Sequence, residues 1–284
     1  MLERFPSHLA DVGGTAVRRA LPRHDRRTVG AWCFLDHFGP ADDALLQIGP
    51  HPHIGIQTVT WLVAGELVHH DSLGSEQPIR PGQLNLMTSG RGIAHAEEMP
   101  GGRQPVHGAQ LWVALPEETR HGANAFEHHA ELPLVGAGSL EVTVLMGQLD
   151  GVRSPARTDT DLVGLALAGG GRASLALDPA FEHALVVLDG SVAVGDEVVA
   201  PGELAYLGPG RDDLALEAAP GSHALVVGGV PFPDRLVMWW NFVGRTKAEI
   251  SAAREDWEGG TDRFAPVTSE LGRIAAPPLP GLRN

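Results

Sequence analysis

The sequence predicts an all-β protein that consists of two tandem jelly-roll barrels and a short C-terminal helix. Short apolar or alternating runs bounded by glycine and proline recur along nearly the whole chain, which is typical of sandwiches and barrels. The 36 glycines and 22 prolines among 284 residues supply the turns that many short strands require. The clearest strand candidates, in chain order, are residues 58–63, 67–69, 83–87, 109–114, 140–146, 184–188 and 224–227.

A weak internal repeat indicates that the two halves are copies of one unit. In the first half an apolar run turns at Gly65, and Pro81-Gly82 starts a later strand. In the second half Gly190 and Pro201-Gly202 follow in the same order. This succession of turns is the skeleton of the cupin barrel, a double-stranded β-helix whose turns need glycine where φ is positive.

The repeat sets the expected domain boundaries. An N-terminal cupin with a metal site is predicted over residues 1–135, and a C-terminal cupin without one over residues 136–245. The changeover is expected near the loop 133–138, which is rich in small residues. A C-terminal helix and tail are then expected over residues 246–284.

Helical periodicity appears only near the end of the chain. A helix that begins at Thr246 or Lys247 would run through Ile250 and Ala253 to about Trp257. A glycine pair follows directly and would end it.

Charge and cysteine content exclude several classes of protein. The net charge of −14 and the pI of about 5.4 repel a phosphate backbone, so direct nucleic-acid binding is not expected. The one basic cluster, residues 18–27, is interpreted as a solvated strand edge, with a patch for nucleic acid or an acidic partner as the alternative. Cys33 is the only cysteine, which excludes an internal disulfide and a cysteine-rich zinc site.

Neither membrane insertion nor export is expected. No apolar run approaches the length of a membrane span, and the first residues lack the apolar region of a signal peptide. The sequence therefore predicts a cytoplasmic protein in which the Cys33 thiol is reduced, buried and inert.

Two short pairs of side chains carry the clearest chemical signal. His51 and His53 are two residues apart, as are His95 and Glu97, and positions i and i+2 of a strand point to the same face. Two such pairs on neighbouring strands offer three nitrogen ligands and one oxygen ligand. This set suits a divalent ion such as iron, manganese, nickel, copper or zinc.

The alternative is that these pairs arise by chance on exposed strands, because the chain holds 14 histidines. Their placement favours the metal site. One pair lies just before the Gly65 turn and the other follows the Pro81-Gly82 turn, where a cupin barrel carries its two metal-binding segments.

Several longer runs resemble the pirin family. The most specific is the stretch from the His-Pro-His run at 51–53 to the His-Ala-Glu run at 95–97. Further similarity occurs at residues 34–38, 71–74, 110–116, 239–246 and 250–257, so the resemblance spans most of the chain.

The resemblance implies a bicupin with one metal ion in the N-terminal barrel, most commonly iron(II), while Mn, Ni, Cu and Zn stay open. His51, His53, His95 and Glu97 fall on the family's four ligand positions. The chain departs from the family at Ile54, where an arginine is usual, and at Gln57, where a glutamate is usual. Neither is a ligand position, but a neutral Gln57 makes the surroundings of the site less negative.

The second half lacks equivalent ligands. His183 stands near the position of the first pair, but no His-x-His run accompanies it. No histidine follows the Pro201-Gly202 turn at the position of the second pair. We therefore expect a structural C-terminal barrel that packs against the first.

The resemblance also implies an activity, a metal-dependent dioxygenase reaction on a flavonol such as quercetin. In that reaction Glu97 would serve as a ligand and as the base that takes the substrate hydroxyl proton. The alternative is a non-enzymatic transcriptional co-regulator or redox-sensing module that binds a protein partner, and a third reading is another small aromatic or enolisable substrate.

Six residues are candidates for the substrate pocket, although core packing is the alternative for each of the large ones. They are Phe34, Asp36, Gln57, Trp61, Met87 and Trp112. The neighbouring run His69-His70-Asp71 is interpreted mainly as a surface hydrogen-bonding segment, since only one of its two histidines can point inward.

Overall fold

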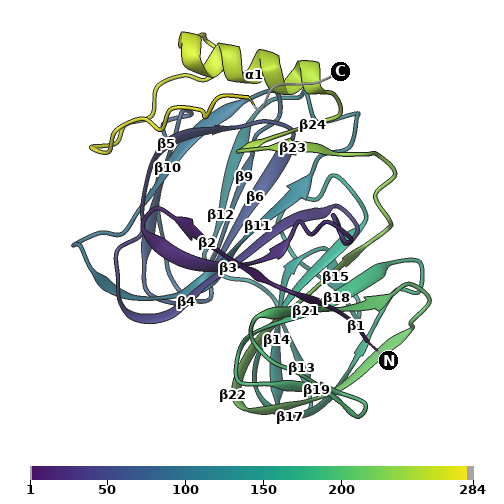
Figure 1. The fold of residues 1–284 in the computed structure, drawn as a ribbon. Coiled ribbons are helices and arrows are strands. Elements are labelled where there is room, and N and C mark those ends of the chain that lie inside the picture. Colours follow the sequence, from purple (N-terminus) through teal and green to yellow (C-terminus); the bar gives the residue numbers. More distant parts are fainter. Residues whose placement is uncertain (1, 280–284) are drawn as a thin grey trace.

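The chain folds into two β-barrels with the helix at the far end of the first. The computed structural model describes residues 2–279. Figure 1 shows the N-terminal barrel above the C-terminal barrel, with α1 (Lys247–Gly259) on the end of the first barrel that faces away from the second. This arrangement confirms the predicted all-β fold of two tandem barrels with a short C-terminal helix. The described part of the chain contains no helix with the length and hydropathy of a transmembrane segment.

Two antiparallel sheets form the N-terminal barrel. The larger has seven strands in the order β12-β9-β6-β11-β4-β3-β2, and the smaller has four in the order β5-β10-β7-β8. The strands of the larger sheet are β2 (His8–Val12), β3 (Thr15–Leu21), β4 (Trp32–Ala44), β6 (Ile56–Ala64), β9 (Leu84–Thr88), β11 (Gln104–Ala114) and β12 (Ala125–His129). Those of the smaller sheet are β5 (Gln47–His53), β7 (Leu67–Asp71), β8 (Glu76–Ile79) and β10 (Ile93–Glu98).

One antiparallel sheet of nine strands makes the C-terminal barrel, and the first strand of the chain joins it because β1 pairs with β21. Its strands are β1 (Glu3–Pro6), β13 (Leu134–Ala137), β14 (Leu140–Met146), β17 (Leu162–Ala176), β18 (Glu182–Asp189), β19 (Val192–Val194), β20 (Glu197–Val199), β21 (Glu203–Gly208) and β22 (Asp213–Gly229). Two small hairpins complete the fold, and they are β15 (Gln148–Leu149) with β16 (Val152–Arg153) and β23 (Val237–Trp239) with β24 (Phe242–Gly244).

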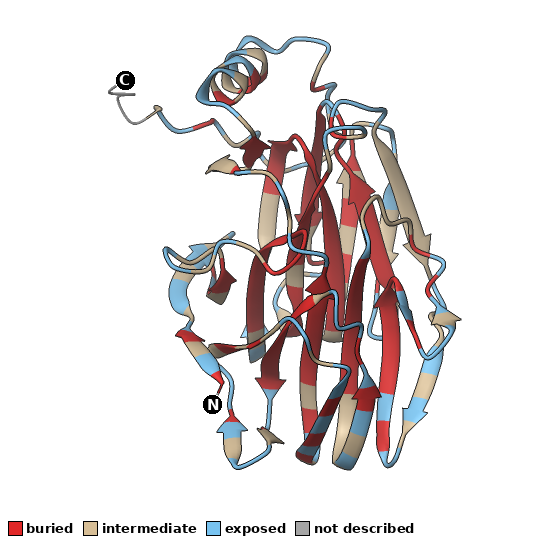
Figure 2. Cartoon of the chain, turned by 90° about the vertical axis from the view of Figure 1, so that its right-hand side faces the viewer, coloured by how far each residue is buried: buried red, intermediate tan, exposed pale blue. Residues whose placement is uncertain are grey.

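The larger sheet of the first barrel has apolar partners on both of its faces. On β6, Leu62 packs into a core inside the first barrel, whereas Val59 and Trp61 pack into a core shared with the second barrel, where they join residues such as Val186. Figure 2 shows the buried positions running along these strands. Because both faces of β6 are covered, its side chains are apolar or neutral at nearly every position instead of alternating with charges.

The helix follows the sequence signals closely. The Thr246 side chain accepts a hydrogen bond from the Glu249 amide at the N-terminus, and Gly260 adopts a left-handed φ of 63° at the C-terminus. Ile250, Ala253 and Trp257 are the buried positions, spaced as one helical face requires. The predicted helix is therefore confirmed.

The segment after α1 returns to the smaller sheet of the first barrel. The Ile274 amide donates a hydrogen bond to the Pro50 carbonyl at 2.9 Å, and the Ser269 hydroxyl donates to the Glu98 carboxylate at 2.5 Å. The Trp257 indole N–H donates to the Ile274 carbonyl at 2.9 Å. These bonds hold the C-terminal segment against β5 and β10, the two strands that carry the metal-ligand candidates.

Candidate metal centre

Two neighbouring strands bring the three histidines together. His51 and His53 lie on β5, and His95 lies on β10 directly opposite His51 in the antiparallel register. The ring centroids of His51 and His95 are 4.3 Å apart, and the His53 ring lies 5.0 Å from each of them. One ligand nitrogen from each of the three rings can be chosen so that all lie within 4.8 Å of one another, which is a spacing that could hold a metal ion.

Backbone carbonyls orient two of these rings. His51 Nδ1 donates to the Gly49 carbonyl at 2.9 Å, and His53 Nδ1 donates to the Asn241 carbonyl at 3.0 Å. A proton on Nδ1 leaves the lone pair on Nε2, so these two rings present Nε2 as the ligand atom. His53 thus depends on the turn between β23 and β24, which is far away in the sequence.

A chain of side chains orients the third ring. Asp71 accepts a hydrogen bond from His69 Nε2 at 3.1 Å, and His69 Nδ1 lies 3.4 Å from His95 Nδ1. Since the His69 proton faces Asp71, its Nδ1 is an acceptor, and His95 must donate from Nδ1. His95 Nε2 is then a lone pair, and it is buried without a hydrogen-bond partner among the described residues. This orphaned nitrogen fits a metal ligand.

The protonation state of the rings also suits coordination. Burial lowers the pKa of His51 to about 4, and it lowers the pKa of His53 and of His95 well below the ordinary histidine range. The three rings are therefore neutral at physiological pH, which is the form that binds metals.

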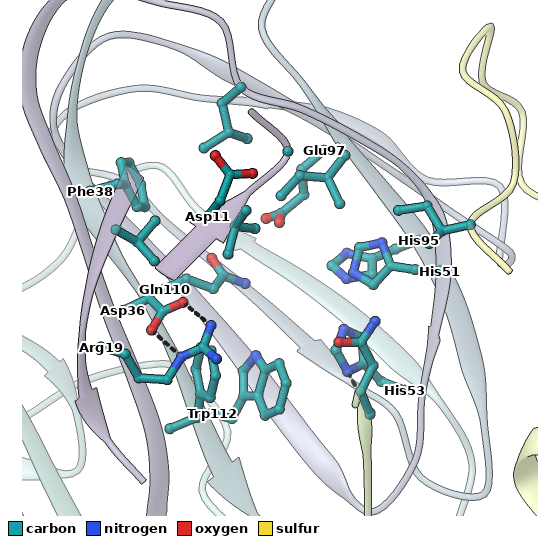
Figure 3. A pocket seen from close by; sticks show the side chains of 18 of the residues that line it. Asp11, Arg19, Asp36, Phe38, His51, His53, His95, Glu97, Gln110 and Trp112 are labelled. Carbon is teal, nitrogen blue, oxygen red and sulfur yellow. Dashed lines mark hydrogen bonds and ion pairs between the residues drawn. The ribbon is translucent and has the colours of Figure 1, made fainter. Parts of the chain in front are cut away.

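Glu97 lies in the same cavity but outside the group of three histidines. It follows a register shift on β10, and its Oε1 accepts a hydrogen bond from the Thr60 hydroxyl at 3.3 Å. Burial raises the pKa of Glu97 to about 7, and the Thr60 hydrogen bond opposes this rise. Figure 3 shows its carboxylate between the histidines and the opposite wall.

The cavity in front of the histidines has a volume of about 330 Å³, within the range of small-molecule sites. Phe34 and Trp112 form an aromatic wall, stacked with centroids 3.9 Å apart, and the Trp112 ring lies 5.0 Å from the His53 ring. Asp36 also lines the cavity. These are three of the six pocket residues expected from the sequence.

The other three expected pocket residues lie outside the lining of this cavity. Gln57 and Trp61 occupy alternate positions of β6 that face the second barrel, where the Gln57 amide donates to the Arg157 carbonyl at 3.4 Å and Trp61 joins the shared core. Met87 is fully buried on β9. The strand period of two determines this outcome, because residues 57 and 61 cannot share a face with Thr60.

Sequence reasoning missed several residues that line the cavity, and the strand-edge interpretation of the basic cluster was wrong for Arg18 and Arg19, which lie on an interior strand. The strand β3 lies between β2 and β4, and Arg19 projects into the cavity. The available signal was the spacing of two residues between Arg19 and the apolar Val17, which puts both side chains on one face of the strand. Other missed lining residues are Asp11, Gln110, Trp240, Asn241 and Ile274, most of them brought in from distant parts of the chain.

His69 was also missed, since the sequence favoured a surface role for this segment. The residue is 4% exposed, and its ring stacks on Phe126 with centroids 4.3 Å apart. His70 points the other way and is half-buried. Within residues 2–279, no group of three metal-ligating side chains other than His51, His53 and His95 comes together, and His183 of the second barrel is buried alone.

Comparison with known families agrees with the motifs. The family model for pirin matches residues 14–113, and the model for the pirin C-terminal cupin domain matches residues 162–264. The chain belongs to the pirin family. Its two halves are therefore the two cupin domains of a pirin-type bicupin.

Several relatives carry the name of an oxygenase. A Pseudomonas aeruginosa protein, whose name gives quercetin 2,3-dioxygenase as a provisional activity, is 48% identical over 99% of this chain and 91% of its own length. A pirin-like protein from Caulobacter vibrioides is 36% identical over 90% of this chain and 92% of its own. A crystal structure from Acinetobacter baumannii, titled quercetin 2,3-dioxygenase, superposes with a TM-score of 0.96 at 41% identity, covering 100% of this chain and 97% of that one.

Proposed function

We propose that this pirin is a dioxygenase that acts on flavonols such as quercetin and uses one iron(II) ion held by His51, His53, His95 and Glu97. The observation that carries the proposal is the convergence of three neutral, buried imidazoles on one end of a cavity with an aromatic wall. The names of the P. aeruginosa and A. baumannii relatives support the choice of substrate. The described residues offer nothing that favours the co-regulator alternative.

When bound, iron supplies a Lewis acid for an enolate oxygen and a redox partner for dioxygen. The protein's own residues orient the substrate and limit the access of water to its reacting end. Phe34 and Trp112 offer a flat surface against which an aromatic ring system can lie, so the reacting end is directed toward His53. The histidines are between 1% and 6% exposed, which limits water at that end.

Glu97 is placed to take the proton of the substrate hydroxyl. Its carboxylate lies in the cavity next to the histidine cluster, and its one hydrogen-bond partner among residues 2–279 is the Thr60 hydroxyl. A carboxylate with free lone pairs beside the ligand nitrogens can accept a proton as the hydroxyl binds. Glu97→Gln keeps an oxygen that can coordinate the metal but is no longer a base, so it should retain metal and lose most turnover; full turnover in this variant would remove the role of base.

The test of the function is oxygen uptake by iron-reconstituted protein given quercetin. We expect uptake by the parent and by His70→Ala, whose ring points away from the site, and none by His53→Ala, which loses a ligand. Metal analysis of each sample separates loss of iron from loss of chemistry. Absence of uptake by parent protein with confirmed iron occupancy would overturn the proposal.

A further inference from the structure

Among the described residues, Arg19 is the one arginine or lysine that lines the cavity. It projects from β3, and Figure 3 shows it across the cavity from His51 and His95. Its side chain is about 25% exposed. A guanidinium at this place faces whatever occupies the end of the cavity remote from the metal centre.

Two contacts fix the plane of the guanidinium. Arg19 Nε and Nη2 donate to the two oxygens of Asp36 at 2.7 Å and 2.6 Å, which is the bidentate geometry. The guanidinium carbon lies 4.5 Å above the Phe34 ring, whose stacking partner is Trp112. The group is therefore held rigidly on the aromatic wall instead of moving freely in solvent.

This arrangement leaves one edge of Arg19 unused. Within the described residues, Nη1 has no hydrogen-bond partner, and it is not among the buried unpaired atoms, so it is accessible. Both oxygens of Asp36 are engaged by Arg19, and the carboxylate is almost fully buried. The pair therefore offers a ligand a hydrogen-bond donor with little net charge.

Gln110 completes the polar end of the cavity. It lies on β11 directly opposite Asp36 on β4, and it lines the same cavity. Its amide has no hydrogen bond within the described residues, so both its carbonyl oxygen and its NH₂ group are available. A hydroxyl placed between the two side chains could accept from Arg19 Nη1 and donate to Gln110 Oε1.

We propose that Arg19 and Gln110 form a recognition subsite for a hydroxyl group on the part of an aromatic substrate remote from the metal-binding end. The inference rests on the proposed flavonol-oxygenase function and adds a substrate class to it, namely flavonols hydroxylated on a remote ring. Arg19 acts here in specificity, and the reacting atoms lie at the histidine end.

The test compares two flavonols in anaerobic binding to the iron(II)-loaded protein. Quercetin carries remote hydroxyls and 3-hydroxyflavone lacks them, and both can be followed by quenching of tryptophan fluorescence. We expect the parent to prefer quercetin by on the order of tenfold, as one or two hydrogen bonds to the remote hydroxyls imply. Arg19→Met should reduce the preference to about one while leaving the Kd for 3-hydroxyflavone within about twofold of the parent value.

Two further variants keep the test sharp. Arg18→Met is the matched control, because Arg18 directly precedes Arg19 on β3 but does not line the cavity. Its Nη1 donates to the Gly39 carbonyl at 3.3 Å. Gln110→Leu is an independent probe that does not leave Asp36 without its partner, and it should lower the preference for quercetin as well.

The outcomes separate this subsite from the function on which it rests. A preference unchanged in both Arg19→Met and Gln110→Leu, with quercetin still bound and oxygenated, would overturn the subsite and leave the oxygenase proposal standing. Failure of the parent to bind either flavonol would overturn both.

Discussion

Asp71→Asn should weaken metal binding although Asp71 contacts none of the three rings that face the metal position. In the native protein Asp71 accepts from His69 Nε2, and this proton placement lets His69 Nδ1 accept from His95. Asparagine can keep the Oδ1 bonds to the Leu73 and Ser75 amides, at 2.8 Å and 3.0 Å, so the local turn is retained. Its NH₂ group would instead meet the His69 Nε2 proton.

The consequence passes along the chain of rings. To avoid two opposed donors, the His69 proton moves to Nδ1, and the His95 proton must then move from Nδ1 to Nε2, where it blocks the ligand lone pair. The loss corresponds to one charge-assisted hydrogen bond, about 1.5–3 kcal/mol. We therefore expect the metal Kd to rise by roughly 10- to 100-fold, as is usual when a partner of a metal-ligating histidine is removed.

The assay is a competition titration with zinc(II) and a chromophoric chelator at neutral pH. The control is His70→Asn, which changes the residue between His69 and Asp71 on the face of β7 that points away from the site. Equal zinc affinity in Asp71→Asn and His70→Asn would refute the proposed orientation of His95.

Three further predictions concern stability and reactivity. Cys33 is fully buried, and burial raises the pKa of its thiol to about 12, so only about 10⁻⁴ of it is thiolate at pH 8. A thiol reagent should therefore label the native protein far more slowly than the urea-unfolded chain, and equal labelling rates would contradict this burial. His183 has two buried ring nitrogens without partners and a pKa lowered by burial to about 4. The unfolded state therefore binds more protons between about pH 6.5 and 4, so the free energy of unfolding decreases as the pH is lowered from about 6.5 to 4. His183→Leu should remove that fall and raise the free energy of unfolding by about 1–3 kcal/mol at pH 7, measured by urea denaturation across pH; an unchanged pH dependence would speak against it. Gly30 has a φ of 53°, and a Cβ there would lie 2.7 Å from Gly229 Cα, whereas Gly221 has a φ of 75° with open space around it. Gly30→Ala should lower the free energy of unfolding by about 3 kcal/mol or more, and Gly221→Ala by about 1–2 kcal/mol. Equal losses in urea denaturation would show that the contact with Gly229 does not contribute to the cost at Gly30.

Several features of this protein could be predicted from the sequence because they depend on local periodicity. Histidines at i and i+2 of a strand share a face whatever the rest of the fold does, so His51 and His53 were expected to act together. The capping residue and apolar spacing of the helix are equally local, and α1 begins and ends where they indicate. The repeated turns at Gly65 and Gly190 likewise indicated two copies of one barrel.

Other features depend on which face of a sheet meets which neighbour. Alternation divides the side chains of β6 into two sets, but it does not say which set faces the cavity and which faces the second barrel. Trp61 packs between the barrels for this reason, while Phe34 and Trp112 form the cavity wall. His69 and His70 posed the same choice, and the pairing of β7 with β10 directed His69 inward.

The sequence by itself determined the fold class, the family and the strand-borne histidine pair, because each follows from residue types at fixed short spacing. Only the tertiary structure decided the supports of the site, namely the Asn241 carbonyl behind His53, the Asp71–His69 chain behind His95, and the Arg19–Asp36 pair across the cavity. These contacts join residues up to 188 positions apart, and the pairing of strands, unlike their period, is set by the closure of the whole barrel.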